Sequence, residues 1–554
     1  MGRKAPILVI GLDGGSWTVL EPLLKAGLMS NLAKLRAEGA WGNLASTLPP
    51  FTAPAWSTFM TGKDPGQHGV LSFFEQDAAS YDMAPGRALA TSAALSQRTL
   101  WSWLGDAGWR VGIVNVPLTY PPQPVNGFLV TGMLTPIGAQ EFTYPPAIAA
   151  ELGPEYVVEP DYLRGIMGSF DLSQLPQQVQ LLADFNRIEA VRTQACLDLI
   201  ARHQPNFFMV VYASTDRISH FFWDYLGGAH GGTDPTMLAS VHAHFRRLDG
   251  WLGKLIAASG PNVTVLMMSD HGFGPAARRW AHVNSWLRDQ GLLVPKKGSA
   301  VGWRNPAYWK SRLGDSHLRR WVRTVLPQRA RRAVRHAERV TDLVNWSATQ
   351  AYFVLIYANV AGVMVNLRGR QAQGVIAPGA EYEAVRDQII AAAKEWCEPI
   401  TGRPLVRRAG RREDFYTGEH VSEFPDVILE LDPDYSTVAN LRSQTVTLAN
   451  PSFRTGEHRP EGIFLAHGPA IRPGEVHDAR IGDLAPTILH LAGVPVPTGL
   501  AGGVLTQIFD QEWLDTHPIS QIAANGRKGA AIDEIYSSEE VAALTERLAG
   551  LGYL

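Results

Sequence analysis

Ile7-Leu8-Val9-Ile10-Gly11-Leu12-Asp13-Gly14-Gly15 is an apolar run near the start of the 554-residue chain that ends in an acid and two glycines. A short apolar run closed by such a turn is typical of a buried strand. Further runs of this kind are Val111–Val116, Phe207–Tyr212, Val263–Met268, Val427–Leu431 and Ile463–Ala466. Helical patterns lie between them, such as Val19–Glu38 and Phe185–Arg202. Strands that alternate with helices predict an α/β fold with a mostly parallel sheet covered on both faces.

Acids and histidines follow several of these runs. Asp13 follows the first run, Asp216 comes shortly after Phe207–Tyr212, Asp270-His271 follow Val263–Met268, and His467 follows Ile463–Ala466. Ligands of such sheets bind beyond the carboxyl ends of the strands. The sequence therefore predicts a polar site at that edge.

Asp216 and His220 are four residues apart, which places them on one face of a helix. That spacing can hold one metal ion, and carboxylate and imidazole ligands suit zinc or manganese. Taken singly, each acid also has an interpretation without metal binding. Asp216 could be a solvated acid or a helix cap, and Asp13 could be an ordinary turn residue.

Thr52 lies in the proline-rich stretch Leu48–Thr58, before a predicted helix at Ala53–Met60. Pro54 in the first turn places Thr52 at the N-cap. One interpretation is a helix cap only. The other is a nucleophile at a helix N-terminus that holds a phosphate, but a threonine hydroxyl would need metal coordination to react.

Taken together, these segments resemble the alkaline phosphatase superfamily, in particular the type I phosphodiesterase and nucleotide pyrophosphatase family and its branch of predicted phosphohydrolases and phosphomutases. The matching motifs occur in family order; they are Val9–Gly14, Thr52-x-Pro54, Thr61-Gly62-x-x-Pro65-x-x-His68-Gly69, Asp216–His220, Ser269–Gly272, Gly456-Glu457-His458 and Gly482–Thr487. The resemblance implies an alkaline-phosphatase-like sheet flanked by helices, with an inserted cap region.

The resemblance also implies two divalent metal ions, zinc first and manganese as the alternative. One ion would be held by Asp216, His220 and His458, and the other by Asp13, Asp270, His271 and the Thr52 oxygen. His282 and His467 are the alternatives to His458. His68 is interpreted as a structural residue that positions the turn after the Thr52 helix.

The implied activity is hydrolysis of a small phosphorylated substrate, phosphodiesterase-like, through a phospho-threonine on Thr52. The alternatives are a phosphomutase or phosphotransferase, a phosphomonoesterase, and a catalytically silent binding protein that keeps the fold. Nucleotide pyrophosphatases carry an asparagine shortly after the His-Gly pair, whereas residues 70–75 here contain none. Asn115 is a candidate substrate-binding replacement, with a structural amide as the alternative.

The chain divides into four predicted parts: a catalytic core at 1–290, a cap at 291–440, a second core part with His458 at 441–510, and a tail at 511–554. The cap contains strand-like runs at Ala351–Tyr357 and Gly362–Leu367 and a helical pattern at Glu381–Trp396. The tail is expected to end in an amphipathic helix at Ser538–Leu554.

Charge is distributed unevenly along the chain. The formal net charge is −2, yet residues 304–339 carry eleven Arg and Lys against two acids, a local balance of +9, which leaves −11 elsewhere. This segment is predicted to form one or two basic amphipathic helices. Three roles are open for them: a solvated cap, a cap that faces an anionic substrate, or a surface that binds anionic lipid. The near-neutral total argues against nucleic acid as a partner.

Neither a signal peptide nor a membrane-spanning segment is evident in the sequence, so the expected compartment is the cytoplasm, with peripheral membrane contact as an option. Two cysteines, Cys196 and Cys397, are too few for a disulfide framework. The oligomeric state is left open.

Overall fold

A nine-stranded sheet forms the centre of the protein, in the order β18-β2-β17-β7-β1-β6-β3-β4-β5. The computed structural model describes residues 5–75, 77–82, 89–92, 97–159, 174–226, 234–296, 340–442, 444–449, 454–524 and 535–551. The strands are β1 Ile7–Leu12, β2 Ala40–Ala45, β3 Val111–Val116, β4 Gly127–Thr131, β5 Thr143–Tyr144, β6 Phe207–Tyr212, β7 Thr264–Met268, β17 Glu461–His467 and β18 Gly474–Arg480.

All strands of this sheet except β17 and β5 run in the same direction. Every residue of β1, β3, β6 and β7 is buried, as expected for strands covered on both faces. The predicted α/β architecture with a mostly parallel sheet is therefore confirmed.

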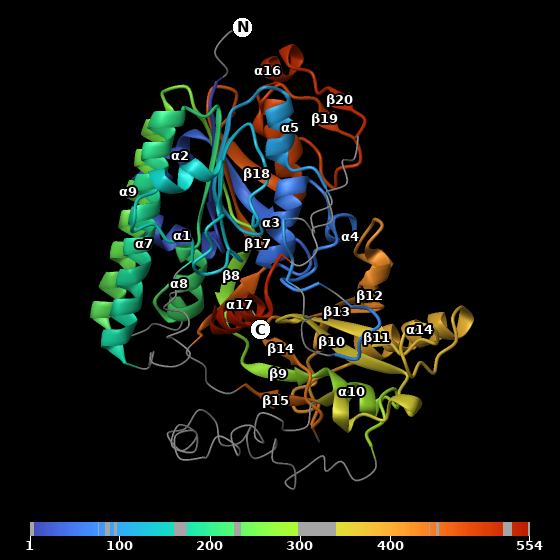
Figure 1. The fold of residues 1–554 in the computed structure, drawn as a ribbon. Helices are drawn as coiled ribbons and strands as arrows, with labels where there is room; N and C mark the ends of the chain where they lie inside the picture. The colour runs from blue at the N-terminus through green and yellow to red at the C-terminus, as the bar shows by residue number, and fades with distance from the viewer. Residues whose placement is uncertain are drawn as a thin grey trace.

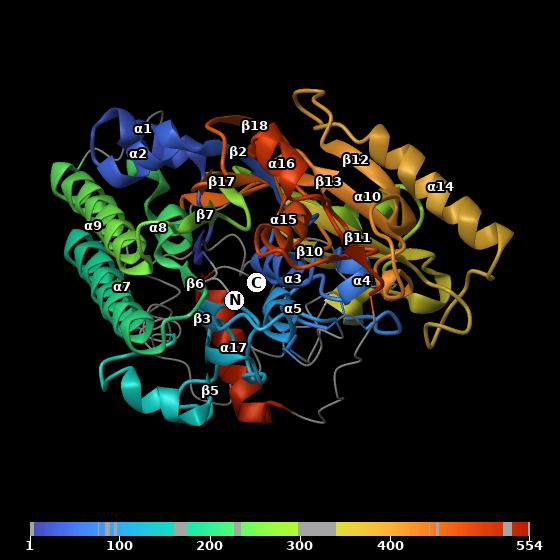
Figure 2. The ribbon, with the colours of Figure 1, turned by 90° about the horizontal axis from the view of Figure 1, so that it is seen from above.

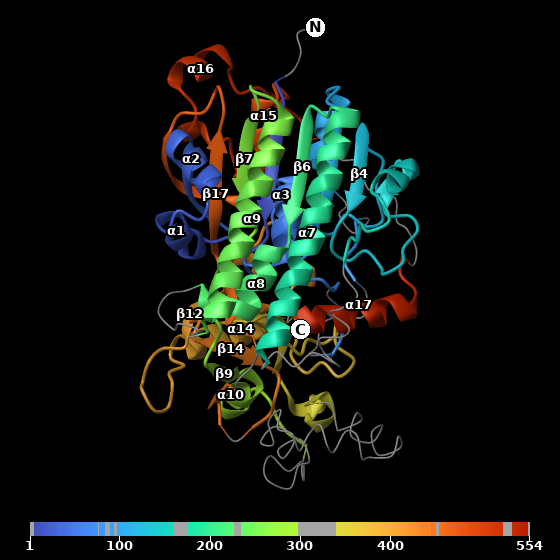
Figure 3. The ribbon, with the colours of Figure 1, turned by 90° about the vertical axis from the view of Figure 1, so that its left-hand side faces the viewer.

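Helices cover both faces of the sheet (Figure 2). One side carries α1 Trp17–Lys25, α2 Ser30–Glu38, α7 Leu175–His203, α8 Ser214–Phe222 and α9 Pro235–Ser259. The other side carries α3 Thr52–Thr61, α4 Pro65–His68, α5 Leu100–Asp106 and α15 Leu484–Leu491. The long helices α7 and α9 lie side by side across the sheet (Figure 3).

A second, smaller unit with its own hydrophobic core lies beside one end of the central sheet (Figure 1). Its four-stranded sheet has the order β10-β11-β13-β12 and its three-stranded sheet the order β14-β9-β15. The elements are β9 Arg279–His282, α10 Val283–Asp289, β10 Ala351–Tyr357, β11 Val360–Val365, α14 Ala380–Lys394, β12 Val406–Arg411, β13 Val427–Leu431, β14 Tyr435–Val438 and β15 Val446–Leu448.

Two small strand pairs and two helices are the remaining strands and α-helices of the described residues, which also contain short 3-10 helices. Strands β8 Gly272–Pro275 and β16 Gly456–Arg459 pair with each other, as do β19 Val496–Pro497 and β20 Gln521–Ile522. The helices are α16 Gln511–Thr516 and α17 Ser538–Leu551. Helix α17 buries Leu544 and Leu548, the apolar face that the tail sequence predicts.

Two predictions about the elements need correction. Val427–Leu431 belongs to the antiparallel sheet of the second unit, because its neighbours are β11 and β12. The predicted helix Val19–Glu38 is two helices, because Gly27 adopts a left-handed conformation (φ 69°) between them. The division at 290, 440 and 510 stays a prediction, and the basic segment 304–339 lies outside the described residues.

No helix in the described part of the chain combines the length and the apolar character needed to cross a membrane.

Candidate functional site

The carboxyl edge of the central sheet gathers the predicted acids and histidines. Asp13 follows β1, and Asp270 and His271 follow β7, the direct neighbour of β1. Asp216 lies in the first turn of α8, which begins two residues after β6, the neighbour on the other side. Because these three strands are parallel, their ends meet at one place.

His458 reaches the same edge from an antiparallel strand. Strand β17 runs against β7, so the residues before β17 lie where the neighbouring strands end. The preceding strand β16 pairs with β8, in a register that sets His458 opposite Phe273, two residues after His271. The His458 and His271 rings stack with centroids 3.5 Å apart.

The two alternatives to His458 lie elsewhere. His467 ends the antiparallel strand β17 and therefore lies at the opposite edge of the sheet, where it is 3.7 Å from the Glu38 carboxylate. His282 ends β9 in the second unit, and its Nε2 is 2.9 Å from the Thr447 hydroxyl. Of the three histidines, only His458 therefore lies at the carboxyl edge of the central sheet.

The first group of side chains consists of Asp216, His220 and His458. One ligand atom from each lies within 4.8 Å of the others. The Asp216 Oδ1 is 3.4 Å from His220 Nε2 and 3.2 Å from His458 Nε2, and the two Nε2 atoms are 3.0 Å apart. All three side chains are buried.

The second group consists of Asp13, Asp270 and His271, which also gather within 4.8 Å. His271 Nε2 is 3.2 Å from Asp270 Oδ2 and 3.8 Å from Asp13 Oδ1. The Asp270 Oδ1 accepts a 3.0 Å hydrogen bond from the backbone N–H of Gly14, whose left-handed conformation (φ 63°) makes the turn after Asp13.

Each of the three histidines is oriented by a backbone carbonyl. The Nδ1 atoms of His220, His271 and His458 lie 3.1, 3.2 and 3.1 Å from the carbonyl oxygens of Gly456, Gly272 and Pro50. The tautomer with hydrogen on Nδ1 suits these contacts, and it leaves the Nε2 lone pair facing the other ligands.

Thr52 adjoins the second group, with its Oγ1 3.4 Å from His271 Nε2. It is the first residue of α3, whereas the N-cap is Phe51, one residue earlier than predicted. Pro54 still lies in the first turn, where its missing N–H does not break the helix. The N-cap residue Phe51 makes no side-chain capping hydrogen bond, so the helix N-terminus beside Thr52 suits an anion.

Burial shifts the pKa values of the acids and histidines in both groups. Burial and the carboxylates of Asp270 and Asp216 raise the pKa of Asp13 well above its ordinary value. Burial likewise raises the pKa of Asp270, with a further contribution from Asp216. Burial lowers the pKa of His220 and His271, so both rings are neutral near pH 7 and their nitrogen lone pairs are available.

These residues form two groups that could hold metal ions. In the described chain, both carboxylate oxygens of Asp13 and Oδ2 of Asp270 are buried without a hydrogen-bond partner. Buried carboxylates that raise one another's pKa are stabilised by a cation between them. The oxygen and imidazole donors suit zinc or manganese.

Three residues beside the first group were missed by the sequence predictions. Tyr357, at the end of β10, donates a 2.6 Å hydrogen bond to Glu457, whose other oxygen is 3.7 Å from Arg454. Although burial alone would raise it, Arg454 and the rings of His220 and His458 lower the pKa of Glu457 to about 2. Glu457 could have been suspected as the middle residue of the Gly456-Glu457-His458 motif, whereas nothing in the sequence links Tyr357 to it.

Two predicted residues have structural contacts. The Asn115 side-chain nitrogen donates to the Val211 carbonyl oxygen at 2.8 Å, and among the described residues no hydrogen bond joins Asn115 to Thr52 or to the two groups. Its predicted substrate role stays a prediction. The His68 Nε2 is 3.1 Å from the Thr58 hydroxyl of α3, and its Nδ1 accepts the Val70 N–H.

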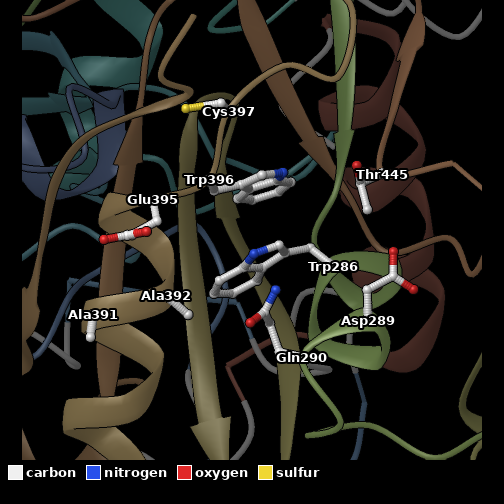
Figure 4. Close-up of a pocket in the computed structure, with 9 residues that line it drawn as sticks. All are labelled: Trp286, Asp289, Gln290, Ala391, Ala392, Glu395, Trp396, Cys397 and Thr445. Carbon is white, nitrogen blue, oxygen red and sulfur yellow. The ribbon is translucent and has the colours of Figure 1, made fainter. Parts of the chain in front are cut away.

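A groove of about 630 Å³ in the second unit contains none of these residues. It surrounds Trp286 of α10 and Trp396, which follows α14, and the two indole rings stack 4.9 Å apart (Figure 4). Its lining includes Asp289, Glu395 and Cys397, but the two groups of described residues that could hold a metal ion both lie at the sheet edge.

Comparison with known proteins agrees with the motifs. The model of the family described as type I phosphodiesterase / nucleotide pyrophosphatase matches residues 7–461, which confirms the resemblance. No curated protein sequence matches the chain.

Solved structures share the fold. Phosphonoacetate hydrolase from Sinorhizobium meliloti 1021, in complexes with phosphonoformate and with phosphonoacetate, is similar at a TM-score of 0.52 and 14% identity, over 89% of this chain and 96% of that one. Murine ectonucleotide pyrophosphatase / phosphodiesterase 5 has a TM-score of 0.48 and 14% identity, over 91% of this chain and 100% of that one. At this identity, the likeness to the hydrolase shows the fold alone.

Proposed function

The chain belongs to the type I phosphodiesterase / nucleotide pyrophosphatase family, and from this premise we propose that it hydrolyses a small phosphorylated substrate through two metal ions and a phospho-threonine on Thr52. It is a phosphohydrolase of the alkaline phosphatase superfamily. The observation that carries the proposal is the pair of buried Asp/His groups beside the Thr52 hydroxyl.

Seven residues would hold the metal ions. Asp216, His220 and His458 would hold one, and Asp13, Asp270, His271 and the Thr52 oxygen would hold the other. When bound, divalent ions such as zinc supply Lewis-acid stabilisation of the negative charge that develops on the phosphoryl oxygens and lower the pKa of hydroxyl groups.

The protein's own residues would then perform a double displacement. The Thr52 hydroxyl would lose its proton to solvent as its oxygen attacks phosphorus, the leaving group would depart with the electron pair of the broken phosphorus–oxygen bond, and the phosphoryl group would become an ester of Thr52. The backbone N–H groups at the start of α3 would stabilise the phosphoryl oxygens. Water then cleaves the phospho-threonine, which releases the product and restores the Thr52 hydroxyl.

Replacement of Thr52 tests the nucleophile. Thr52→Ala should lower turnover by at least about 1,000-fold, in the range seen when a covalent nucleophile is removed. Thr52→Ser keeps a hydroxyl and should retain part of the activity. Both variants should bind metal nearly as well as the wild type, measured by elemental analysis after dialysis. Full activity in Thr52→Ala would overturn the mechanism.

Substrate class is tested with two chromogenic esters on the metal-loaded enzyme. Preference for bis-p-nitrophenyl phosphate over p-nitrophenyl phosphate supports a phosphodiesterase, and the reverse supports a phosphomonoesterase. Phosphoryl transfer to an added alcohol, seen by product analysis, would instead identify a phosphotransferase. Absence of bound metal after loading with zinc and with manganese would favour a silent binding protein.

A further inference from the structure

Trp56 is a fully buried side chain on the helix that carries Thr52. It comes four residues after Thr52 in α3, so the two side chains lie on the same face of that helix. Its ring is among the largest side chains of the described residues that have no exposed surface. Helix α3 therefore joins the proposed nucleophile to a large buried ring with a single hydrogen-bond donor, the indole N–H.

The indole ring lies against strand β1 at a glycine. A Cβ atom at Gly11 would be 2.5 Å from Cη2 and 3.3 Å from Cζ2 of Trp56, so a side chain at position 11 would displace the ring. A glycine inside a strand commonly marks such a close approach. The six-membered part of the Trp56 ring thus rests on the backbone of β1.

Asp13 lies on the same face of β1 as Gly11. Side chains alternate between the two faces of a strand, so residues two apart share a face. The ladder between β1 and β6 continues to Asp13, whose backbone N–H donates to the Tyr212 carbonyl oxygen at 3.0 Å. The Asp13 carboxylate therefore leaves the sheet on the side where the Trp56 ring lies.

The Trp56 indole N–H and the Asp13 carboxylate are both buried without a hydrogen bond of standard geometry. Among the described residues, neither Nε1 of Trp56 nor either carboxylate oxygen of Asp13 has such a partner. Burial has the largest effect on the pKa of Asp13 and raises it, whereas the Trp56 side chain is among the groups that lower it, as a donor to the charged form. The N–H is thus close to the carboxylate without completing a hydrogen bond.

We propose that Trp56 is a positioning residue of the second group, whose indole N–H donates to the Asp13 carboxylate when that carboxylate holds a cation. Carboxylates that bind metal ions are commonly held by a further hydrogen bond, and the loss of such a partner weakens metal binding by about 10- to 100-fold. This inference rests on the proposed two-metal function and deepens it. Helix α3 would supply the Thr52 oxygen directly and would orient Asp13 through Trp56.

Equilibrium zinc binding tests the proposal without turnover. Competition with a chelating dye should resolve two zinc ions in the wild type, and Asp13→Asn identifies the ion of the second group. Trp56→Phe keeps an aromatic ring but removes the donor, so it should weaken that ion by about 10- to 100-fold and leave the other nearly unchanged. The matched control is Trp17→Phe, which removes a buried indole N–H that donates to the Gly42 carbonyl oxygen at 2.7 Å and should leave both zinc affinities unchanged.

An isosteric replacement covers the case in which Trp56→Phe does not fold. Benzothienylalanine introduced at position 56 keeps the bicyclic ring and replaces the N–H by a sulfur atom, which cannot donate. It should weaken the same zinc ion by a similar factor, whereas the same replacement at position 17 should not. In NMR spectra of labelled indole nitrogens, the proton signal that is lost from the position-56 variant should move downfield when zinc is added to the wild type.

Three results would overturn the role of Trp56. They are an equal loss of both zinc ions in the Trp56 variants, an unchanged second ion in the benzothienylalanine variant, and an indole signal that zinc does not move. The two proposals also fail separately. If Thr52→Ala stays active while the Trp56 variants lose the second ion, the phospho-threonine mechanism is wrong and the role of Trp56 stands. If Thr52→Ala is inactive while the Trp56 variants bind zinc like the wild type, the mechanism stands and Trp56 only fills space.

Discussion

At the scale of single residues, the site concentrates negative charge in a buried place. Asp13, Asp216 and Asp270 are each at most 1% exposed, and Asp13 and Asp270 have raised pKa values for that reason. A carboxyl group whose pKa is higher in the folded state destabilises that state once the pH exceeds its unfolded value. Without metal ions, the site therefore opposes folding at neutral pH.

This linkage predicts how the stability of the metal-free protein depends on pH. The lowered pKa values of His220 and His271 make stability fall below about pH 6.5, the unfolded value, so they contribute nothing above pH 7. From pH 7 to 8 the folded state still holds carboxyl protons that the unfolded state has released. Stability should fall by up to about 1.4 kcal/mol per carboxyl over this interval.

Denaturant unfolding at pH 7 and pH 8 measures the effect, with and without zinc. The zinc-loaded protein should show little change, because bound cations keep the carboxylates charged at both pH values. Asp13→Asn should reduce the slope of the metal-free protein. A metal-free protein whose stability rises from pH 7 to 8 would contradict the interpretation.

Residue type and position together made most of the site predictable. Asp13, Asp270 and His271 each come within three residues of the end of an apolar run, so their place at the sheet edge could be inferred from the sequence. Arg454 and Tyr357 could not, because an arginine in a loop and a tyrosine at the end of a strand carry no signal of their own. The contact of Tyr357 with Phe51 exists only after the second unit has packed, and the contact of Arg454 with His220 joins residues far apart in the sequence.

At the scale of elements, the direction of a strand decides which histidine reaches the site, and the sequence does not reveal that direction. Nothing in Ile463–Ala466 shows that this strand runs against β7, yet that direction brings His458 to the site and takes His467 away. Similarly, the run Val427–Leu431 does not reveal which sheet it joins, because any sheet core favours such residues. Periodicity identifies a strand, but its neighbours are fixed by contacts distant in sequence.

Helix α8 illustrates how an element is held in place. It carries Asp216 and His220, and its first backbone N–H, at Ser214, donates a 3.0 Å hydrogen bond to Glu189 of α7. Glu189 also pairs with the buried Arg192. The Arg217 side chain of α8 pairs with Glu159 at 2.6 Å. Buried charges thus connect the ligand helix to its surroundings.

Removal of the Glu189 charge should loosen this helix. Glu189→Gln leaves Arg192 buried without its partner charge, which we expect to lower the free energy of unfolding by about 3–5 kcal/mol. It should also weaken zinc binding, measured by competition with a chelating dye. The matched control is Glu21→Gln, which breaks a surface pair with Arg36 and should change stability by less than about 1 kcal/mol. Equal effects of the two substitutions would contradict this role for Glu189.

At the scale of the whole molecule, the second unit contributes to the site of the first. Strand β10 contains an irregularity between Leu355 and Tyr357, and the next residue, Ala358, has a left-handed conformation with φ 40°. Such features place side chains where a regular strand would not. Here they accompany the Tyr357 ring, which stacks on Phe51 and lies 4.9 Å from the His458 ring.

Substitutions of Tyr357 should therefore affect catalysis through the contact between the two units. Tyr357→Phe keeps the ring but leaves Glu457 without its hydroxyl donor, so kcat/KM should fall by about 5- to 150-fold, equivalent to 1–3 kcal/mol. Tyr357→Ala should lower it further, since Phe51 and His458 also lose a packing partner. The control is Tyr435→Phe, the same chemical change on a buried ring of the second unit, whose hydroxyl faces Glu398 at 3.4 Å. If both Phe variants lower thermal stability alike and leave kcat/KM unchanged, Tyr357 only stabilises the fold. A fall in kcat/KM that is confined to the Tyr357 variants would show that the second unit positions the Thr52 segment.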